Sequence, residues 1–186
     1  MKAIYGVFIA AGLAVGTYAA SVPSIQALPS TVQGRPGTAV GWGLTLTYTA
    51  PGDWVLLNDS FFTGSPVYGT YKDYVVNEFI VAGPAPESSS VTVPFSSGTA
   101  GLGEFDINAK VPYTSVPGNI VVDYSIFSQD PNSPTFDPTS FVGSGQASAA
   151  VTVNIVPEPG TFALLLAAFS LLAFVIFAFE PYRSKC

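Results

Sequence analysis

The fold of this chain is decided by the stretch Gly41-Trp42-Gly43-Leu44-Thr45-Leu46-Thr47-Tyr48. Its bulky residues occupy every second position, so Trp42, Leu44 and Leu46 share one face while the threonines share the other. This period of two predicts a β-strand with one buried face and one solvated face.

The same alternation recurs through the middle of the chain. It is clearest in the segments 91–95, 105–111, 120–126 and 147–155, and further strands are expected at 54–57 and 74–81. Turn residues such as Pro51-Gly52-Asp53 and Pro117-Gly118-Asn119 separate these segments. We therefore predict an all-β domain over residues 39–156, an antiparallel β-sandwich of immunoglobulin-like or jelly-roll type. Residues 20–38 are predicted to be an extended lead-in.

The N-terminal end has the three parts of a secretory signal peptide. Lys2 supplies the positive start, an uncharged apolar core follows, and small residues precede the sandwich. Cleavage between Ala19 and Ala20 would place Thr17 and Ala19 in the two small pockets of signal peptidase. We therefore expect residues 1–19 to be removed, with an uncleaved membrane anchor as the alternative.

The C-terminal end contains an apolar run without a charge over residues 161–179. A helix of this length rises about 1.5 Å per residue and crosses a hydrocarbon core of ~30 Å. Arg183 and Lys185 follow the run, and basic residues beside a span stay in the cytoplasm. The pattern predicts one transmembrane helix, a cytoplasmic tail over 180–186, and a β-domain on the far side of the cell membrane.

The residues that join domain to helix carry a resemblance to a known family. Pro157-Glu158-Pro159-Gly160, followed by a hydrophobic helix and a basic tail, resembles the PEP-CTERM sorting signal of Gram-negative bacteria. The resemblance covers 156–185. It implies recognition and cutting by exosortase, a membrane-embedded transpeptidase, at Pro157, Glu158 and Pro159. It also implies release to the cell surface or extracellular matrix, association with extracellular polysaccharide, and a role in biofilm.

Composition narrows the chemistry open to the domain. The chain has no histidine and a single cysteine, Cys186, so an intrachain disulfide and a zinc site of cysteines and histidines are excluded. A net charge of −6 makes nucleic-acid binding unfavourable, because phosphates are repelled. We expect no cofactor and no enzymatic activity.

Three constellations are weaker candidates for chemistry. Glu104 and Asp106 lie two apart on one strand face, where solvated surface acids are the ordinary interpretation and a glycosidase pair the alternative. Asp130, Asn132 and Asp137 supply oxygen ligands in one loop, where capping of the loop is the ordinary interpretation and a calcium site the weaker alternative. Lys72 or Lys110 could serve a serine nucleophile, but no motif supports this.

Two tryptophans bear on sugar binding. Trp42 is in phase with the apolar face and is predicted to be core, whereas Trp54 begins a strand beside a turn and is the better candidate for exposure. The preferred hypothesis is an exported, anchored surface or matrix protein whose partners are signal peptidase, exosortase and membrane lipid. The alternatives are a carbohydrate-binding module or adhesin, which predicts an exposed aromatic row, and a secreted hydrolase, which predicts a deep acidic pocket.

Overall fold

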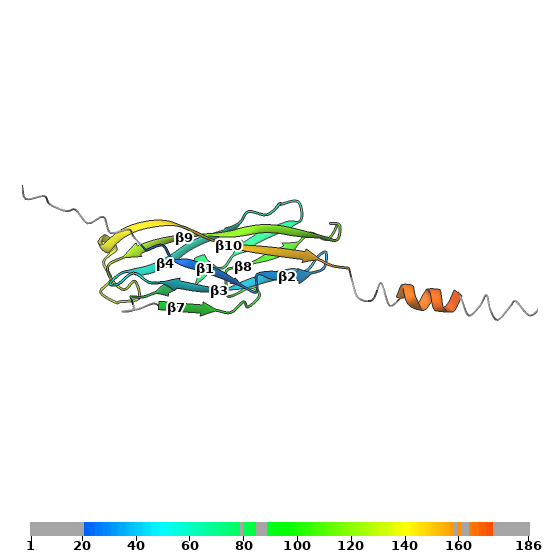
Figure 1. Ribbon diagram of the computed structural model, residues 1–186, viewed down its shortest axis with the longest axis horizontal. Coiled ribbons are helices and arrows are strands. Elements are labelled where there is room, and N and C mark those ends of the chain that lie inside the picture. Colours follow the sequence, from blue (N-terminus) through cyan, green and yellow to red (C-terminus); the bar gives the residue numbers. More distant parts are fainter. Residues whose placement is uncertain (1–20, 79, 85–88, 158–159, 161–163, 173–186) are drawn as a thin grey trace, which may run out of the picture.

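The computed structural model describes residues 21–78, 80–84, 89–157, 160 and 164–172. Its strands form two packed layers, with β9 and β10 along one side of the domain and β3 and β7 along the other (Figure 1). The predicted signal peptide with Lys2, Ala19 and Ala20, the motif residues Glu158 and Pro159, and the tail residues Arg183 and Lys185 lie outside the described residues.

The first sheet is built around β3 (Ala39–Tyr48). β1 (Ser24–Leu28) pairs along one edge of β3, and β8 (Gly103–Ile107) and β7 (Ser89–Val93) share the other edge. β5 (Gly69–Asp73) completes this sheet by pairing with β8, and every pairing is antiparallel.

The second sheet has the order β2-β10-β9-β4-β6. Its strands are β2 (Thr31–Gly34), β10 (Phe141–Ile155), β9 (Thr114–Phe127), β4 (Trp54–Phe62) and β6 (Val81–Ala82). β2 runs parallel to β10, whereas the other pairs are antiparallel. The prediction of an all-β sandwich is confirmed.

The chain begins the sandwich earlier than predicted. Residues 24–34, assigned from sequence to an extended lead-in, are two strands, β1 in the first sheet and β2 in the second. The chain changes sheets at Pro29 and Ser30, and the Ser30 carbonyl accepts from the Thr152 amide (2.9 Å). Ile25 and Val32 point into the core from these strands, so the segment contributes to the sandwich rather than leading into it.

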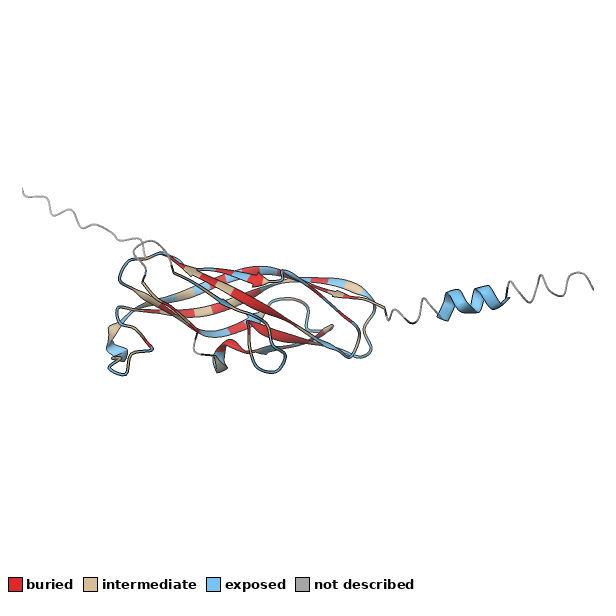
Figure 2. Ribbon diagram, turned by 90° about the horizontal axis from the view of Figure 1, so that it is seen from below, coloured by how far each residue is buried: buried red, intermediate tan, exposed pale blue. Residues whose placement is uncertain are grey.

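The core lies between the sheets, as the red segments of Figure 2 show. The face predicted from sequence for β3 is buried throughout: Trp42, Leu44, Leu46 and Tyr48. Alternate residues of β9 and β10 meet them from the other sheet: Ile120, Val122, Tyr124 and Ile126, and Ala147, Ala149, Val151, Val153 and Ile155. Full burial of one aliphatic side chain stabilises a fold by roughly 1.5–3 kcal/mol, so these alternating rows hold the sandwich together without a disulfide.

The strand predicted at 74–81 is wrong. Residues Val75–Asn77 form a short 3₁₀ helix, η1, and only Val81–Ala82 are strand. The cause is the carboxylate of Asp73, which accepts hydrogen bonds from the Val75 amide (2.9 Å) and the Val76 amide (3.4 Å). This side-chain turn bends the backbone out of the extended conformation.

Residues 164–172 near the C-terminus are helical and exposed throughout (Figure 2). Their large side chains are apolar, and Leu164 and Leu171 expose 72% and 71% of their surface. The Ser170 hydroxyl donates to the Leu166 carbonyl (2.7 Å), which satisfies it within the helix. Within the described part of the chain, no helix combines the length and apolarity needed to cross a bilayer. The predicted span at 161–179 is described only in part.

Candidate functional site

The junction between the sandwich and the predicted sorting element is built by the last strand. β10 ends at Ile155, and the ladder to β2 extends one residue further because the Val156 amide donates to the Gly34 carbonyl (2.9 Å). Val156 and Pro157 then line a cleft of about 370 Å³ together with Arg35 and Thr38. The first residue of the predicted motif, Pro157, therefore belongs to the surface of the folded domain.

The two acids predicted to lie together on β8 have different environments. Asp106 is partly exposed, but Glu104 is buried, with only 4% of its surface accessible. The prediction of a solvated surface acid is wrong for Glu104. The loop over residues 94–102 covers this part of the sheet. The alternation of side chains predicts which face of a strand a residue lies on, but it does not predict whether a loop covers that face.

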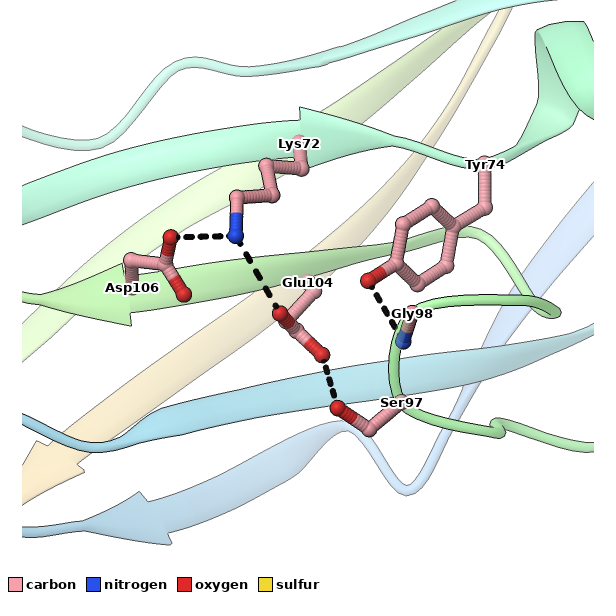
Figure 3. Close-up of polar contacts among 6 residues, drawn as sticks. All are labelled: Lys72, Tyr74, Ser97, Gly98, Glu104 and Asp106. Carbon is pink, nitrogen blue, oxygen red and sulfur yellow. Dashed lines mark hydrogen bonds and ion pairs between the residues drawn. The ribbon is translucent and has the colours of Figure 1, made fainter.

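Figure 3 shows how the buried carboxylate is satisfied. The Ser97 hydroxyl donates to Glu104 Oε2, and Lys72 Nζ lies 3.6 Å from Glu104 Oε1 and 2.6 Å from Asp106 Oδ2. Beside them, the Tyr74 hydroxyl accepts from the Gly98 amide (2.8 Å). These contacts hold the 94–102 loop against the sheet, and we call Lys72, Tyr74, Ser97 and Glu104 the loop clamp.

The loop clamp has the wrong chemistry for a serine–lysine nucleophile. A hydrogen bond to Asp106 raises the pKa of Lys72, whereas a lysine base needs a lowered one. The Ser97 hydroxyl donates to a carboxylate and has no base among the described contacts. Burial likewise raises the pKa of Tyr74. The clamp therefore positions a loop, and none of its members lines the cleft beside Pro157.

A second polar cluster was not predicted from the sequence. Ser60 is buried on β4 and donates to Asp73 Oδ1, and the Tyr71 hydroxyl lies 2.8 Å from the Ser60 hydroxyl. Desolvation raises the pKa of Asp73, and the neighbouring carboxyl of Asp59 raises it further. Burial also raises the pKa of Tyr71. No signal in the sequence marks Ser60, because it is out of phase with the buried Val55 and Leu57. The register shift that follows Leu57 in β4 turns Ser60 to the buried face.

Two of the three candidate calcium ligands, Asp130 and Asp137, cap turns of their own loop, and Asn132 contributes its backbone amide to one of these caps. Asp130 Oδ1 accepts from the Asn132 amide (2.8 Å), and Asp137 Oδ1 accepts from the Thr139 amide (2.8 Å). The bond from Thr139 lowers the pKa of Asp137. Among the residues that the structure describes, no three acidic, histidine or cysteine side chains gather in a way that could hold a metal ion. The geometry is that of loop capping.

Aromatic side chains pack in the core, and three more form a row at one end of the sandwich. Trp42 is fully buried, as predicted, and Trp54 is half-buried where β4 begins. Trp54 is opposite Phe127 of β9, which is opposite Phe141 of β10, so three aromatic residues follow one another across the sheet. Phe127 also packs edge-on against Phe136, with ring centroids 5.1 Å apart. Phe141 is 52% exposed.

Comparisons with known proteins give little further information. No family model matches the chain, and no curated protein matches it. Among solved structures, a chain from the crystal structure of a CaDoc0917 variant in complex with CaCohA2 at pH 5.5 is similar, with 15% sequence identity and a TM-score of 0.36. The match covers 73% of this chain and 100% of that one. A TM-score this low supports no inference about function.

Proposed function

We propose that this protein is an exported, non-enzymatic surface or matrix protein of a Gram-negative cell envelope, anchored by its C-terminal helix and processed by exosortase at Pro157-Glu158-Pro159. The strand order of its sandwich, β1-β3-β8-β5 against β2-β10-β9-β4-β6, is compatible with an immunoglobulin-like display domain. Such a domain presents its loops and faces to partners and leaves attachment to its ends.

The observation that carries the proposal is the direct passage from the last strand to an apolar helix. β10 is paired on both sides, with β9 and β2, up to Ile155, and Val156 adds one further hydrogen bond on the β2 side. Residues 164–172 then present leucine and phenylalanine side chains that no part of the described structure covers. A soluble protein rarely exposes such a surface, because burying apolar area is worth roughly 25 cal/mol per Å².

The experiment is mass spectrometry of the mature protein from a Gram-negative host, with and without a functional exosortase. We expect a new C-terminus near Pro157 only when the enzyme is present. The triple variant Pro157→Ala, Glu158→Ala and Pro159→Ala should retain its intact tail, whereas the control Pro134→Ala, an exposed loop proline, should be processed normally. An intact tail on the wild-type chain in the exosortase-positive strain would refute processing and leave permanent anchoring.

A second candidate function, carbohydrate binding, is favoured by the aromatic row of Trp54, Phe127 and Phe141. Aromatic faces stack on sugar rings, and this row lies at the end of the sandwich remote from Pro157. Affinity electrophoresis of the full chain in gels containing exopolysaccharide from the producing strain tests it. Phe141→Ser should abolish retardation, whereas Phe61→Ser, which removes a similarly exposed phenylalanine outside the row, should not.

A secreted hydrolase is less well supported. The cleft beside Pro157 and a second cleft beside Tyr71 are lined by residues without a carboxylate, and the buried Glu104 lies in neither. We therefore keep display, with or without sugar binding, as the conclusion.

A further inference from the structure

The end of the sandwich from which the chain leaves, which we call the base, has an unusual composition. The base comprises residues 33–40, 63–68, 108–114 and 154–157. These segments contain no aspartate or glutamate, although the chain has 12 acidic residues, and Glu158 follows directly after the last segment. They do contain Arg35 and Lys110, both exposed and neither ion-paired with a described carboxylate.

Exposed apolar and aromatic side chains accompany these two cations. Tyr113 is 59% exposed and Val67 is 70% exposed. A basic surface interleaved with tyrosine and an aliphatic residue is the composition that proteins present to the lipid headgroup region. The opposite end of the sandwich carries the acidic residues Asp130 and Asp137, so the domain has a positive base and a negative far end.

Hydrogen bonds hold the loops of the base side by side. The turn after Arg35 is pinned to the end of β8, because the Gly37 amide donates to the Ile107 carbonyl (3.0 Å). The Asn108 side-chain amide donates to the Val67 carbonyl (2.9 Å), which joins the loop at 63–68 to the loop that carries Lys110. Tyr113 is adjacent to Val156, since the next residue, Thr114, pairs with Ile155. The base is therefore one continuous surface around Pro157.

Chain length fixes how far this surface can lie from the C-terminal helix. The described helical residue Gly160 follows Pro157 by three positions, which span at most about 11 Å in full extension. The polar headgroup layer of each leaflet is roughly 5–8 Å thick. If the helix lies in a bilayer, the base cannot lift clear of the headgroups by more than a few ångströms.

We propose that the base is a membrane-contacting surface, in which Arg35 and Lys110 bind phospholipid phosphates and Tyr113 and Val67 enter the headgroup region. The inference rests on the membrane anchoring proposed above and adds an orientation to it. With the base held on lipid, the aromatic row at the far end points away from the membrane. The acidic far end reinforces this orientation, because an anionic leaflet repels it.

The test uses the full chain with Cys186→Ser, reconstituted into vesicles of phosphatidylethanolamine and phosphatidylglycerol (3:1). An environment-sensitive fluorophore is attached at Pro112→Cys in the base or at Gln146→Cys on the exposed face of β10. Iodide quenching reports the access of water to each label. We expect quenching at position 112 to be at least about threefold weaker than at position 146.

Two pairs of substitutions with the same change in net charge test whether Arg35 and Lys110 make the contact with lipid. The pair Arg35→Gln and Lys110→Gln should raise quenching at position 112 about twofold, and 0.5 M salt should do the same to the parent protein. The control pair Ser144→Glu and Ser148→Glu changes the net charge equally but lies away from the base, and it should leave quenching at position 112 unchanged.

Vesicle flotation separates this inference from the proposed anchoring. One outcome is that the protein floats with the vesicles while its label at position 112 is quenched as strongly as the label at position 146. That result would refute the contact between the base and lipid and would leave the proposed anchoring intact. Protein that does not float overturns both. Protection at position 112 that neither salt nor the glutamine pair alters overturns the assignment to Arg35 and Lys110.

Discussion

The loop clamp yields the sharpest stability prediction, because two carboxylates on one strand contact the same lysine from different environments. The Glu104 side chain is 5% exposed and that of Asp106 is 40% exposed, and both lie near Lys72 Nζ. Replacing each with alanine compares a buried carboxylate with a half-exposed one at nearly the same position. We expect Glu104→Ala to be strongly destabilising and Asp106→Ala to be nearly neutral.

The magnitude follows from the contacts that each substitution removes. Glu104→Ala deletes a charge-assisted hydrogen bond from Ser97, worth about 1.5–3 kcal/mol, and one buried methylene group, worth about 0.8 kcal/mol. Lys72 contributes little, because its side chain is 52% exposed and keeps Asp106. The expected loss is about 2–4 kcal/mol for Glu104→Ala and about 0–1 kcal/mol for Asp106→Ala.

The assay is thermal and urea unfolding of the full chain in detergent, followed by the near-ultraviolet circular dichroism of its tryptophans. For a domain of this size 1 kcal/mol lowers Tm by roughly 3–5 °C, so Glu104→Ala should lower Tm by about 6–20 °C. Glu104→Gln keeps an acceptor for Ser97 and should fall between the two alanine variants. Equal losses for Glu104→Ala and Asp106→Ala, or a loss below about 1 kcal/mol for the former, would refute the reasoning.

Three further predictions concern other parts of the sandwich. Because the pKa of Asp73 is raised above its usual 3.8, the stability of the wild-type protein should fall as pH rises through that raised pKa. In urea titrations at pH 4–7, Asp73→Asn should abolish this fall, and the variant should be more stable than the wild type at pH 7. Gly41→Ala would place a methyl group against the ring of Phe95 and should cost about 1–3 kcal/mol in urea unfolding, whereas Gly143→Ala, with nothing within 4 Å, should change stability by less than about 0.5 kcal/mol. Exchanging 5 mM CaCl₂ for EDTA should move Tm by less than about 1 °C; a shift of several degrees that Asp137→Ala removes would show that the loop binds calcium after all.

The alternation of side chains made most of the sandwich predictable. Every second residue from Trp42 to Tyr48 and from Ile120 to Ile126 is buried, because a strand covered on one face only must separate its side chains in this way. β1 and β2 show the same alternation, with Ile25 and Val32 buried, but each is too short to stand out beside its prolines.

The polar parts were harder to predict, for two physical reasons. The burial of Glu104 depends on a loop that folds over β8, and alternation contains no information about such coverage. The strand predicted at 74–81 is interrupted at Val75 because the Asp73 carboxylate binds backbone amides that a strand would use for pairing. The apolar residues in this segment favour a strand prediction and give no sign of that interaction. For the loop that carries Asp130 and Asp137, capping was the favoured prediction and calcium the weaker one, because the same side chains can serve a turn or a cation.

The two-sided pairing of β10 has a mechanical consequence. This strand, from Phe141 to Ile155, is flanked by β9 along its length and by β2 at its end, and it leads directly to the C-terminus. When the far end of the domain is held, a pull on that terminus acts along the strand, so the rungs of both ladders must shear together rather than peel apart one by one. Single-molecule extension should therefore record a high rupture force, a property that the proposed display at a cell surface would use.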